Sequence, residues 1–293
     1  MHKAIPTYHS CSINTNQYGK DDTLISRFEP YLEQHNNLCL PHKHSFYHLL
    51  YFTKGTGTHV IDFETFEVKK GQIYFMSPGQ VHSWQFKQQP DGYIVNFSEN
   101  FFRSFLLSPT YLERFSFFNS NATEGVVQLA KDVQAKAQDL FEELLHIPSK
   151  ECEFTEDMLR IKLLELFMLC ANCKPQTKSN APLNKSNHII REFKLLVDER
   201  YIQLHLPKQY AELLYITPNN LNMLCKQLLG KPAGEVIRDR LLLEAKRLLV
   251  NVDMGIAEIA YKLSFTDHAH FTKFFKKETG ETPDEFRKRQ MTK

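Results

Sequence analysis

Hydrophobic residues between about positions 38 and 98 fall into short segments that are typical of β-strands. Four of these segments are rich in Ile, Val, Tyr and Phe, and they lie at residues 48–53, 58–63, 71–76 and 92–97. Stretches that contain glycine or proline, such as Lys54–Gly57 and Ser77–Gly79, separate the segments and predict turns. Short strands at this spacing indicate a small antiparallel barrel or sandwich, in which alternate residues face the interior.

From about residue 126 onward, the spacing of the apolar positions changes to that of amphipathic helices. Residues 126–147 and 156–170 carry apolar side chains at positions i, i+3, i+4 and i+7. We expect this pair of helices to cover the barrel or to pair with a second subunit. Residues 174–187 then combine two prolines with several Ser, Asn and Lys residues and little hydrophobicity, which predicts a linker.

The chain after this linker has a helical pattern, and its last part predicts a helix-turn-helix. A short helix over residues 256–265 is followed by a second helix, whose phenylalanines at 271, 274 and 275 share one side. We expect the Thr266 hydroxyl to cap this second helix, with Asp267 in its first turn and Gly280 at its end. The other side of the helix carries His and Lys, so it can face DNA.

A weaker copy of the same pattern lies upstream. Residues 206–216 predict its first helix, and residues 219–230 predict its second. Thr217 is the expected N-cap, Pro218 stands where its missing N–H costs least, and Gly230 is the expected end. We therefore expect two helix-turn-helix units.

The distance between the two units suits a DNA duplex. Their second helices begin at Thr217 and Thr266, which are 49 residues apart. Between them, residues 233–251 predict one helix that is roughly 28 Å long at about 1.5 Å per residue. Because successive major-groove faces of DNA lie about 34 Å apart, a rigid helix of this length can place both units on one side of a duplex.

Composition adds only mild support for DNA binding. The 293 residues include 42% hydrophobic and 24% charged residues, which is typical of a globular chain with about two domains. The formal net charge is only +2, although residues 187–293 contain 18 Lys and Arg against 14 Asp and Glu.

We see neither a signal-peptide pattern nor a membrane-spanning apolar run, so we expect a cytoplasmic protein without a membrane partner. Cys170 and Cys173 form a lone CxxC pair, which we interpret as core thiols.

Residues 256–287 resemble the C-terminal signature of the AraC/XylS-type transcriptional regulators. The shared features are the Ile-Ala-Ala core, Phe265, the Phe-Lys-Lys run, Gly280, Thr282-Pro283 and Arg287. The resemblance implies a DNA-binding domain over residues 188–293, with helix-turn-helix units at about 206–230 and 256–280. Tyr215 and Ser264 stand at turn positions where the family usually has Gly, so we expect strained turns there.

The same resemblance implies which residues contact double-stranded promoter DNA. Asn can pair with adenine, Lys can donate to guanine, and Ala or Met can pack on a thymine methyl group. Phosphate contacts from lysines position a protein without specifying sequence. The expected base contacts come from Asn219, Asn222, Met223, His268, Ala269, Thr272 and Lys273, and the expected phosphate contacts come from Lys226, Lys276 and Lys277.

Residues 41–84 resemble the cupin-like barrel that precedes the DNA-binding domain in many of these regulators. The shared features are a His-rich entry strand, a Gly-x-Gly turn, Lys70-Gly71 and the Pro-Gly-Gln-Val-His run at 78–82. The resemblance implies a two-domain α+β chain. Residues 1–173 would form an effector-binding and dimerisation domain, with the barrel at about 38–98 and helices at about 126–173, before the linker at 174–187 and the all-α domain.

A barrel mouth is a natural site for a small molecule. The expected effector contacts are His42, His44, Lys54, His82 and Trp84. Trp84 matches an aromatic position near the sugar of an arabinose-responsive family member. His42 and His44 can point to the same face, and His82 stands where metal-binding cupins often supply a third histidine, so an Fe, Zn or Ni site stays open. Since those cupins also supply a carboxylate where this chain has Phe46 and His48, we expect no bound metal and no cofactor.

Three functional interpretations follow. The leading one is a non-enzymatic, sequence-specific transcription regulator that responds to an unidentified small molecule. It would form a homodimer through the helices at 126–173 and work with RNA polymerase, whether as activator or repressor. The second is a cupin metalloenzyme fused to a DNA-binding domain, although no nucleophile–base pair, P-loop or dinucleotide fingerprint stands out. In the third, the barrel only dimerises.

Overall fold

The computed structural model describes residues 6–9, 23–103, 105–106, 111–119, 122–147, 153–173, 185–250 and 254–291. The chain divides into two compact units, one within Pro6–Thr177 and one within Lys178–Lys293. Residues 174–184 of the predicted linker lie outside the described residues, and the remaining three belong to a helix that begins at Lys185. Across the described ranges, no helix combines the length and the apolar character that crossing a membrane requires.

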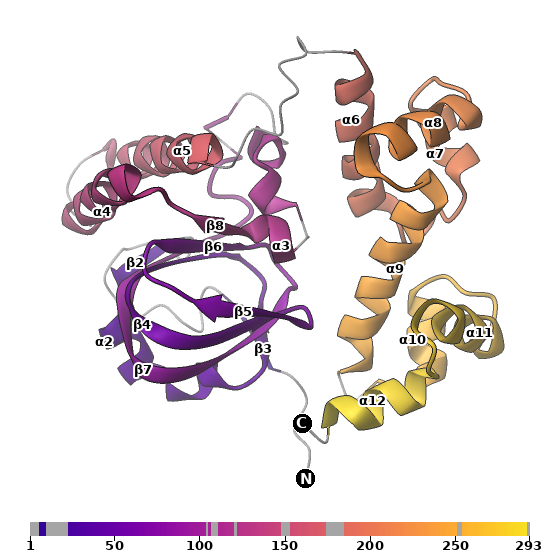
Figure 1. Cartoon of the computed structure of the whole chain (residues 1–293), viewed down its shortest axis with the longest axis horizontal. Helices are drawn as coiled ribbons and strands as arrows, with labels where there is room; N and C mark the ends of the chain where they lie inside the picture. The colour runs from indigo at the N-terminus through magenta and orange to yellow at the C-terminus, as the bar shows by residue number, and fades with distance from the viewer. Residues whose placement is uncertain are drawn as a thin grey trace. The chain divides into compact units, whose positions relative to one another are not determined.

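The first unit is built on one curved sheet that encloses an interior (Figure 1). The path of neighbouring strands is β1-β3-β7-β4-β6-β8, while β2 pairs with β7 and β5 pairs with β4. All pairs are antiparallel except β1 with β3. The strands are β1 (Thr7–Tyr8), β2 (Thr23–Arg27), β3 (His42–His44), β4 (Tyr47–Ile61), β5 (Glu64–Val68), β6 (Gln72–Met76), β7 (Val81–Phe97) and β8 (Val126–Gln128).

The long strand β4 corrects one prediction. The segment 48–53 and residues 58–61 of the next segment are parts of this single strand, and Lys54–Gly57 forms no turn between them. Instead, the pairing of β4 with β7 shifts register there, as it does at β-bulges. A Cβ on Gly55 would lie 2.7 Å from the Cα of Pro90, and one on Gly57 would lie 2.3 Å from the Gln85 carbonyl oxygen. The glycines therefore allow the two backbones to approach at the bulge.

Alternating side chains of the sheet enter two separate cores. In β4, Leu49 and Tyr51 join one core, whereas Leu50 and Phe52 join the other. This is the period of two that a strand imposes. Because both faces of β4 are covered at residues 49–52, its sequence is continuously apolar there, whereas residues 53–59 are polar or glycine.

Two helices cover the outer face of the sheet (Figure 1). They are α4 (Lys131–His146), which buries Phe141 and Leu144, and α5 (Thr155–Cys173), which buries Phe167 and Cys170. The predicted start of the first helix, residue 126, is wrong. Val126–Gln128 instead forms β8 and extends the sheet beside β6, because its two valines fit a half-buried pleated edge.

The remaining short elements of this unit connect and close the barrel. The helix α2 lies on β2 and β7, and its Phe28 packs against Phe52 and Trp84 in the inner core. The others are short turns. Their bounds are α2 (Phe28–Gln34), η1 (Asn36–Cys39), η2 (Tyr111–Arg114), η3 (Ser116–Phe118) and α3 (Ala122–Gly125).

The second unit is all-helical over its described residues and contains two helix-turn-helix pairs (Figure 1). The pairs are α7 with α8 and α10 with α11, and α9 connects them. This confirms the predicted fold class, a β-barrel unit followed by an all-α unit. The helices are α6 (Lys185–Arg200), α7 (Pro207–Leu213), α8 (Pro218–Leu229), α9 (Ala233–Leu249), α10 (Ile256–Lys262), α11 (His268–Thr279) and α12 (Pro283–Met291).

The ends of the two second helices follow the sequence signals with one exception. The Thr217 hydroxyl accepts a hydrogen bond from the Asn220 N–H at 3.2 Å, and α8 ends at Gly230 as predicted. In α11 the N-cap is Asp267, not Thr266, because the Asp267 carboxylate accepts the His270 N–H at 2.8 Å. A carboxylate is the stronger acceptor for the positive end of a helix.

The turns within both pairs are strained, as the sequence predicts. Tyr215 has a φ of 54° and Ser264 has a φ of 58°, which is the left-handed region. A side chain in this region costs about 1–2 kcal/mol relative to glycine. Both residues come after the first helix of their pair, where the chain turns toward the second helix. The turn geometry is therefore kept although neither residue is glycine.

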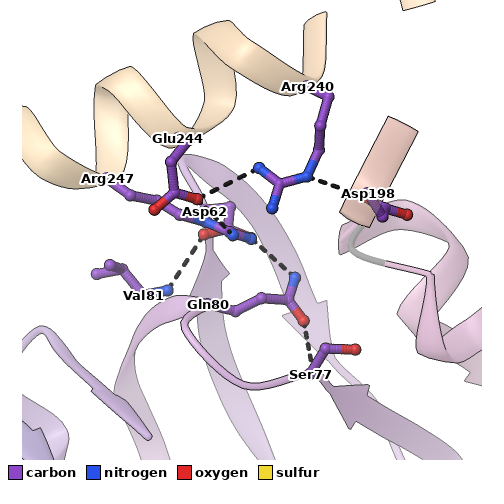
Figure 2. Close-up of polar contacts among 8 residues, drawn as sticks. All are labelled: Asp62, Ser77, Gln80, Val81, Asp198, Arg240, Glu244 and Arg247. Atoms are coloured by element: carbon purple, nitrogen blue, oxygen red, sulfur yellow. Dashed lines mark hydrogen bonds and ion pairs between the residues drawn. The ribbon is translucent and has the colours of Figure 1, made fainter. Parts of the chain in front are cut away.

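The connecting helix α9 is fixed by charged groups as well as by its apolar side. Figure 2 shows Arg240, which donates to Asp198 of α6 at 2.8 Å and to Glu244 at 3.3 Å. The guanidinium group also lies 3.9 Å from the centre of the Tyr201 ring. Arg287 of α12 donates to the Leu249 carbonyl at 2.9 Å, so this signature residue holds the end of α9.

Candidate functional site

The helix α11 presents a polar face beside a buried one. Phe271 and Phe275 are fully buried against the rest of the unit. The polar face contains the predicted DNA contacts: His268, Ala269, Lys273, Lys276 and Lys277 are exposed, and Thr272 is half-buried. The Thr272 hydroxyl donates to the His268 carbonyl at 2.8 Å, so only its lone pairs stay available to a ligand.

The matching helix α8 departs from the prediction at one residue. Asn219, Met223 and Lys226 are exposed, but Asn222 is half-buried. The Asn222 carbonyl oxygen accepts the N–H of Ala233 at 3.1 Å, where α9 begins. Bidentate pairing with adenine needs both the carbonyl and the amide of an asparagine. The Asn222 side-chain oxygen is therefore already engaged at the start of α9, and its amide N–H groups are the atoms that it offers to a base in this conformation.

The cationic side chains of these two helices are available to phosphates. The ion pairs found among the described residues do not include the lysines at positions 226, 273, 276 and 277. Neighbouring basic residues are instead engaged within the unit, as with Arg289, which pairs with Glu281. Unpaired, exposed ammonium groups are what non-specific phosphate contacts require.

A second cluster of polar groups lies inside the barrel. It consists of five histidines, which are at most 3% exposed. The register that pairs β3 with β7 puts His42 directly opposite His82, and their ring centres are 4.1 Å apart. The histidines come from three strands: His42 and His44 from β3, His48 and His59 from β4, and His82 from β7.

Three hydrogen bonds orient these rings. The Nδ1 of His42 lies 2.7 Å from the Leu40 carbonyl, and the Nδ1 of His48 lies 2.6 Å from the Asn96 side-chain oxygen. Because these oxygens can only accept, both Nδ1 atoms carry the proton, and both Nε2 atoms keep a lone pair. The Nε2 of His59 lies 3.1 Å from the Nδ1 of His82.

The other ring nitrogens of the cluster lack partners among the described residues. These are the Nε2 of His42, His48 and His82, the Nδ1 of His59 and both nitrogens of His44. Buried polar groups are usually hydrogen-bonded, so six unpaired nitrogens in one cluster are unusual for a packed core.

Burial keeps these imidazoles neutral. Loss of solvation lowers the pKa of His42 to about 4 and that of His48 to about 3. It also lowers the pKa of His44, His59 and His82 well below the usual value, with neighbouring imidazoles acting in the same direction. At neutral pH the cluster therefore carries lone pairs and no charge.

The loop before β7 is held in place by a polar network, which Figure 2 shows. The Asp62 carboxylate accepts hydrogen bonds from the Gln80 amide at 2.8 Å and from the Val81 N–H at 3.1 Å. The Gln80 side-chain oxygen in turn accepts the Ser77 N–H at 2.8 Å. Since His82 follows directly, this network fixes where its ring enters the barrel.

The predicted effector contacts divide into two groups. Trp84 lies with the histidines, its ring centre 5.0 Å from that of His82, and its indole N–H has no partner among the described residues. Lys54 is exposed at the bulge of β4, opposite Asp91, and does not join them. The prediction missed His48 and His59. For His48 the signal was alternation with Leu50 and Phe52 along β4, whereas for His59 the bulges hid the signal because they change which parity faces inward.

Comparisons with known proteins match both units. A family model described as an AraC-like ligand binding domain matches residues 30–167, and one described as a helix-turn-helix domain matches residues 210–289.

The arabinose operon regulatory protein of Salmonella typhimurium is 25% identical over 236 residues, which cover 76% of this chain and 77% of that protein. The uncharacterized HTH-type transcriptional regulator YfiF of Bacillus subtilis is 23% identical over 301 residues, which cover 94% and 88%. Among solved structures, ToxT of Vibrio cholerae is 13% identical with a TM-score of 0.42, and the match covers 90% of this chain and 96% of that one.

Proposed function

Because this chain belongs to the AraC family of transcriptional regulators, we propose that it binds specific promoter sequences under the control of a small-molecule effector inside its barrel. It is a DNA-binding transcriptional regulator with an N-terminal ligand-binding domain. The observation that supports sequence-specific binding best is the pair of second helices, α8 and α11, each with an exposed polar face and a buried apolar one. The relatives named above are regulators, which supports a role without catalysis.

The spacing of α8 and α11 would allow both helices to contact one DNA duplex. The 17 residues of α9 are about 26 Å long, which approaches the distance of about 34 Å between successive major-groove faces. In this proposal Asn219 and Met223 of α8 read bases, together with His268, Ala269, Thr272 and Lys273 of α11. The lysines at 226, 276 and 277 contact phosphates. Asn222 contributes its amide N–H groups only, because its oxygen is occupied by α9.

Control by the effector requires a difference in affinity between two states of the protein. A ligand shifts an equilibrium only if it binds one arrangement better than the other. The interior of the barrel supports such a ligand site, because Trp84 and the histidine cluster combine apolar surface with unpaired polar atoms. His42, His44 and His82 are the proposed contacts, and Lys54 is no longer one of them.

We also propose a homodimer through the outer helices. Four large apolar side chains at helical spacing, on and just before α5, are 45–60% exposed: Phe154, Met158, Ile161 and Met168. A stripe of this kind on the surface of a unit marks a surface for association. Two copies joined there would present two DNA-binding units to one promoter, where RNA polymerase is the further proposed partner.

Selection of random duplex DNA on the purified full-length chain tests the proposed function. We expect an enriched motif with two conserved blocks about one helical turn apart, one for each second helix. Repeating the selection on a chain with Lys273→Ala should relax one position of one block. Weak, salt-sensitive binding to every sequence, without an enriched motif, would contradict sequence-specific regulation.

A further inference from the structure

The inside of the barrel contains more unpaired donor and acceptor atoms than packing alone explains. Six imidazole nitrogens there lack hydrogen-bond partners among the described residues, and all belong to buried rings. Leaving buried polar atoms unpaired costs free energy, whereas apolar side chains of similar shape would avoid that cost. A ligand that these nitrogens can bind would remove the penalty.

Three of the rings converge on one point. His42, His44 and His82 each offer a ring nitrogen, and these nitrogens all lie within 4.8 Å of one another. With zinc–nitrogen bonds of about 2.0–2.1 Å, two ligand nitrogens of a tetrahedral ion lie about 3.4 Å apart. Rotations of the rings that move each nitrogen by up to about 0.8 Å would therefore bring all three within bonding distance of one ion.

We propose that His42, His44 and His82 bind one divalent transition-metal ion of the zinc type inside the barrel. The inference rests on the proposed function, in that it assigns a chemical class to the ligand of the same barrel. The expectation of no bound metal rested on the missing carboxylate. In the structure, three buried imidazoles converge, and they supply enough ligand atoms for an ion without a carboxylate.

Neighbouring groups orient two of the three ligands in the way that metal sites require, whereas neither ring nitrogen of His44 has a partner among the described residues. A metal-binding histidine usually donates its other ring N–H to an oxygen or a comparable acceptor, which fixes the tautomer. His42 does so, because its Nδ1–H donates to the Leu40 carbonyl and leaves Nε2 for the ion. His82 can donate its Nδ1–H to the Nε2 of His59, which likewise leaves the Nε2 of His82 for the ion.

The ligand atoms also select the class of metal. The group contains three imidazoles and no carboxylate, as far as the described residues extend. Imidazole ligands suit Zn²⁺, Ni²⁺, Cu²⁺ and Fe²⁺, whereas Mg²⁺, Ca²⁺ and Mn²⁺ prefer oxygen. Three protein ligands leave the fourth position of a tetrahedral ion for a donor atom from outside the protein. An effector with such an atom would bind the ion directly.

Zinc binding to the full-length chain, produced without a histidine tag and stripped with a chelator, tests the inference. We expect calorimetry with Zn²⁺ alone to give one ion per chain. The melting temperature should rise by about 5–10 °C when free Zn²⁺ exceeds its Kd 100-fold. Binding of Co²⁺ alone should give the intense visible absorption of a four-coordinate ion with nitrogen ligands. A failure to take up either ion would overturn the inference.

Two matched variants separate metal binding from packing. His44→Phe keeps an aromatic ring beside Phe46 and removes two unpaired nitrogens. It should raise the melting temperature of the metal-free chain and weaken Zn²⁺ binding at least about 100-fold, since even loss of an outer partner costs ~10–100-fold. His146→Gln changes an exposed histidine at the end of α4 and should leave binding unchanged. Equal Zn²⁺ affinity of the chain with and without His44→Phe would overturn the inference.

The outcome is separable from that of the proposed function. If His44→Phe fails to fold, the Co²⁺ spectrum of the unaltered chain decides, and the spectrum of a hydrated six-coordinate ion would count against the site. The DNA selection is run twice, once with a chelator and once with Zn²⁺, and a motif enriched in either run counts. An enriched motif without metal uptake would overturn the metal site alone, and metal uptake without a motif would overturn the regulator alone.

Discussion

Lys273 and Lys277 are both exposed on α11, yet they are expected to contact different parts of DNA. Lys273→Ala should weaken binding to the preferred site by about 1–3 kcal/mol and relax the choice of base at one position. Lys277→Ala should weaken binding to all sequences alike and reduce the slope of log Kd against log salt by about 1. Titrations of specific and random duplexes at several salt concentrations measure both effects. Identical behaviour of the two variants on both duplexes would contradict this division.

Ser264 offers a test of the strain in the second helix-turn-helix turn. Its φ of 58° costs about 1–2 kcal/mol, which exceeds the ~0.5–1 kcal/mol that glycine adds in unfolded-chain entropy. Ser264→Gly should therefore raise the free energy of unfolding by about 0.5–1 kcal/mol. Ser264→Ala retains the strain and serves as the control. Urea titration measures both variants, and a gain in Ser264→Ala equal to that in Ser264→Gly would rule out strain as the cause.

Sequence reasoning identified some residues of the proposed sites and missed others for a physical reason. His42, His44 and His82 were found because their spacing and the run before His82 are local signals. His48 precedes the bulge and has the same parity as Leu50 and Phe52, so alternation along β4 was enough to find it, whereas His59 follows the register shifts, which change the parity. The hydrogen bond between Asn222 and Ala233 joins two helices, and no local pattern encodes it.

At the scale of elements, Asn222 links the first half of α8 to the start of α9. Its oxygen supplies the cap that Pro232, at the N-cap position, cannot supply with a side chain. Asn222→Ala should lower the free energy of unfolding by about 1 kcal/mol, as loss of a cap does. Asn222→Asp keeps an acceptor and should retain most of that stability. Denaturation of both variants checks this, and equal losses would show that the oxygen is not what matters.

The predicted elements were right where the spacing of apolar residues is periodic. They were wrong where the structure depends on pairing with a strand that is distant in the sequence. The helices of the second unit and their caps follow apolar spacing, Thr217, Gly230 and Gly280, all of which act locally. The glycines of β4 were interpreted as a turn, because sequence alone cannot distinguish a turn from a close approach of two strands. Val126–Gln128 was assigned to a helix, because pairing with β6 is a contact at long range.

At the scale of the whole molecule, the chain combines a sensor-like barrel unit and a DNA-binding unit that have separate cores. The barrel unit is organised around two apolar clusters, one inside the sheet and one beneath α4 and α5. With a formal net charge of only +2, one chain has little non-specific attraction for DNA. In the proposed dimer, two linked chains would overcome that limit, because the second binding event would become intramolecular.

Ile161→Glu tests whether α5 supplies this link. Ile161 is 54% exposed on the apolar stripe, so a carboxylate there should prevent association without disturbing the core beneath α5. We expect light scattering to show a dimer for the unaltered chain and a monomer for this variant. Affinity for a DNA site with two copies of the motif should then fall by about 100-fold or more, while affinity for one copy stays unchanged. Leu40→Glu alters an apolar residue away from α5 that is even more exposed than Ile161, and this variant should remain a dimer. A dimer that survives Ile161→Glu would place the interface elsewhere, and equal losses on both DNA sites would mean that the variant damages DNA binding itself.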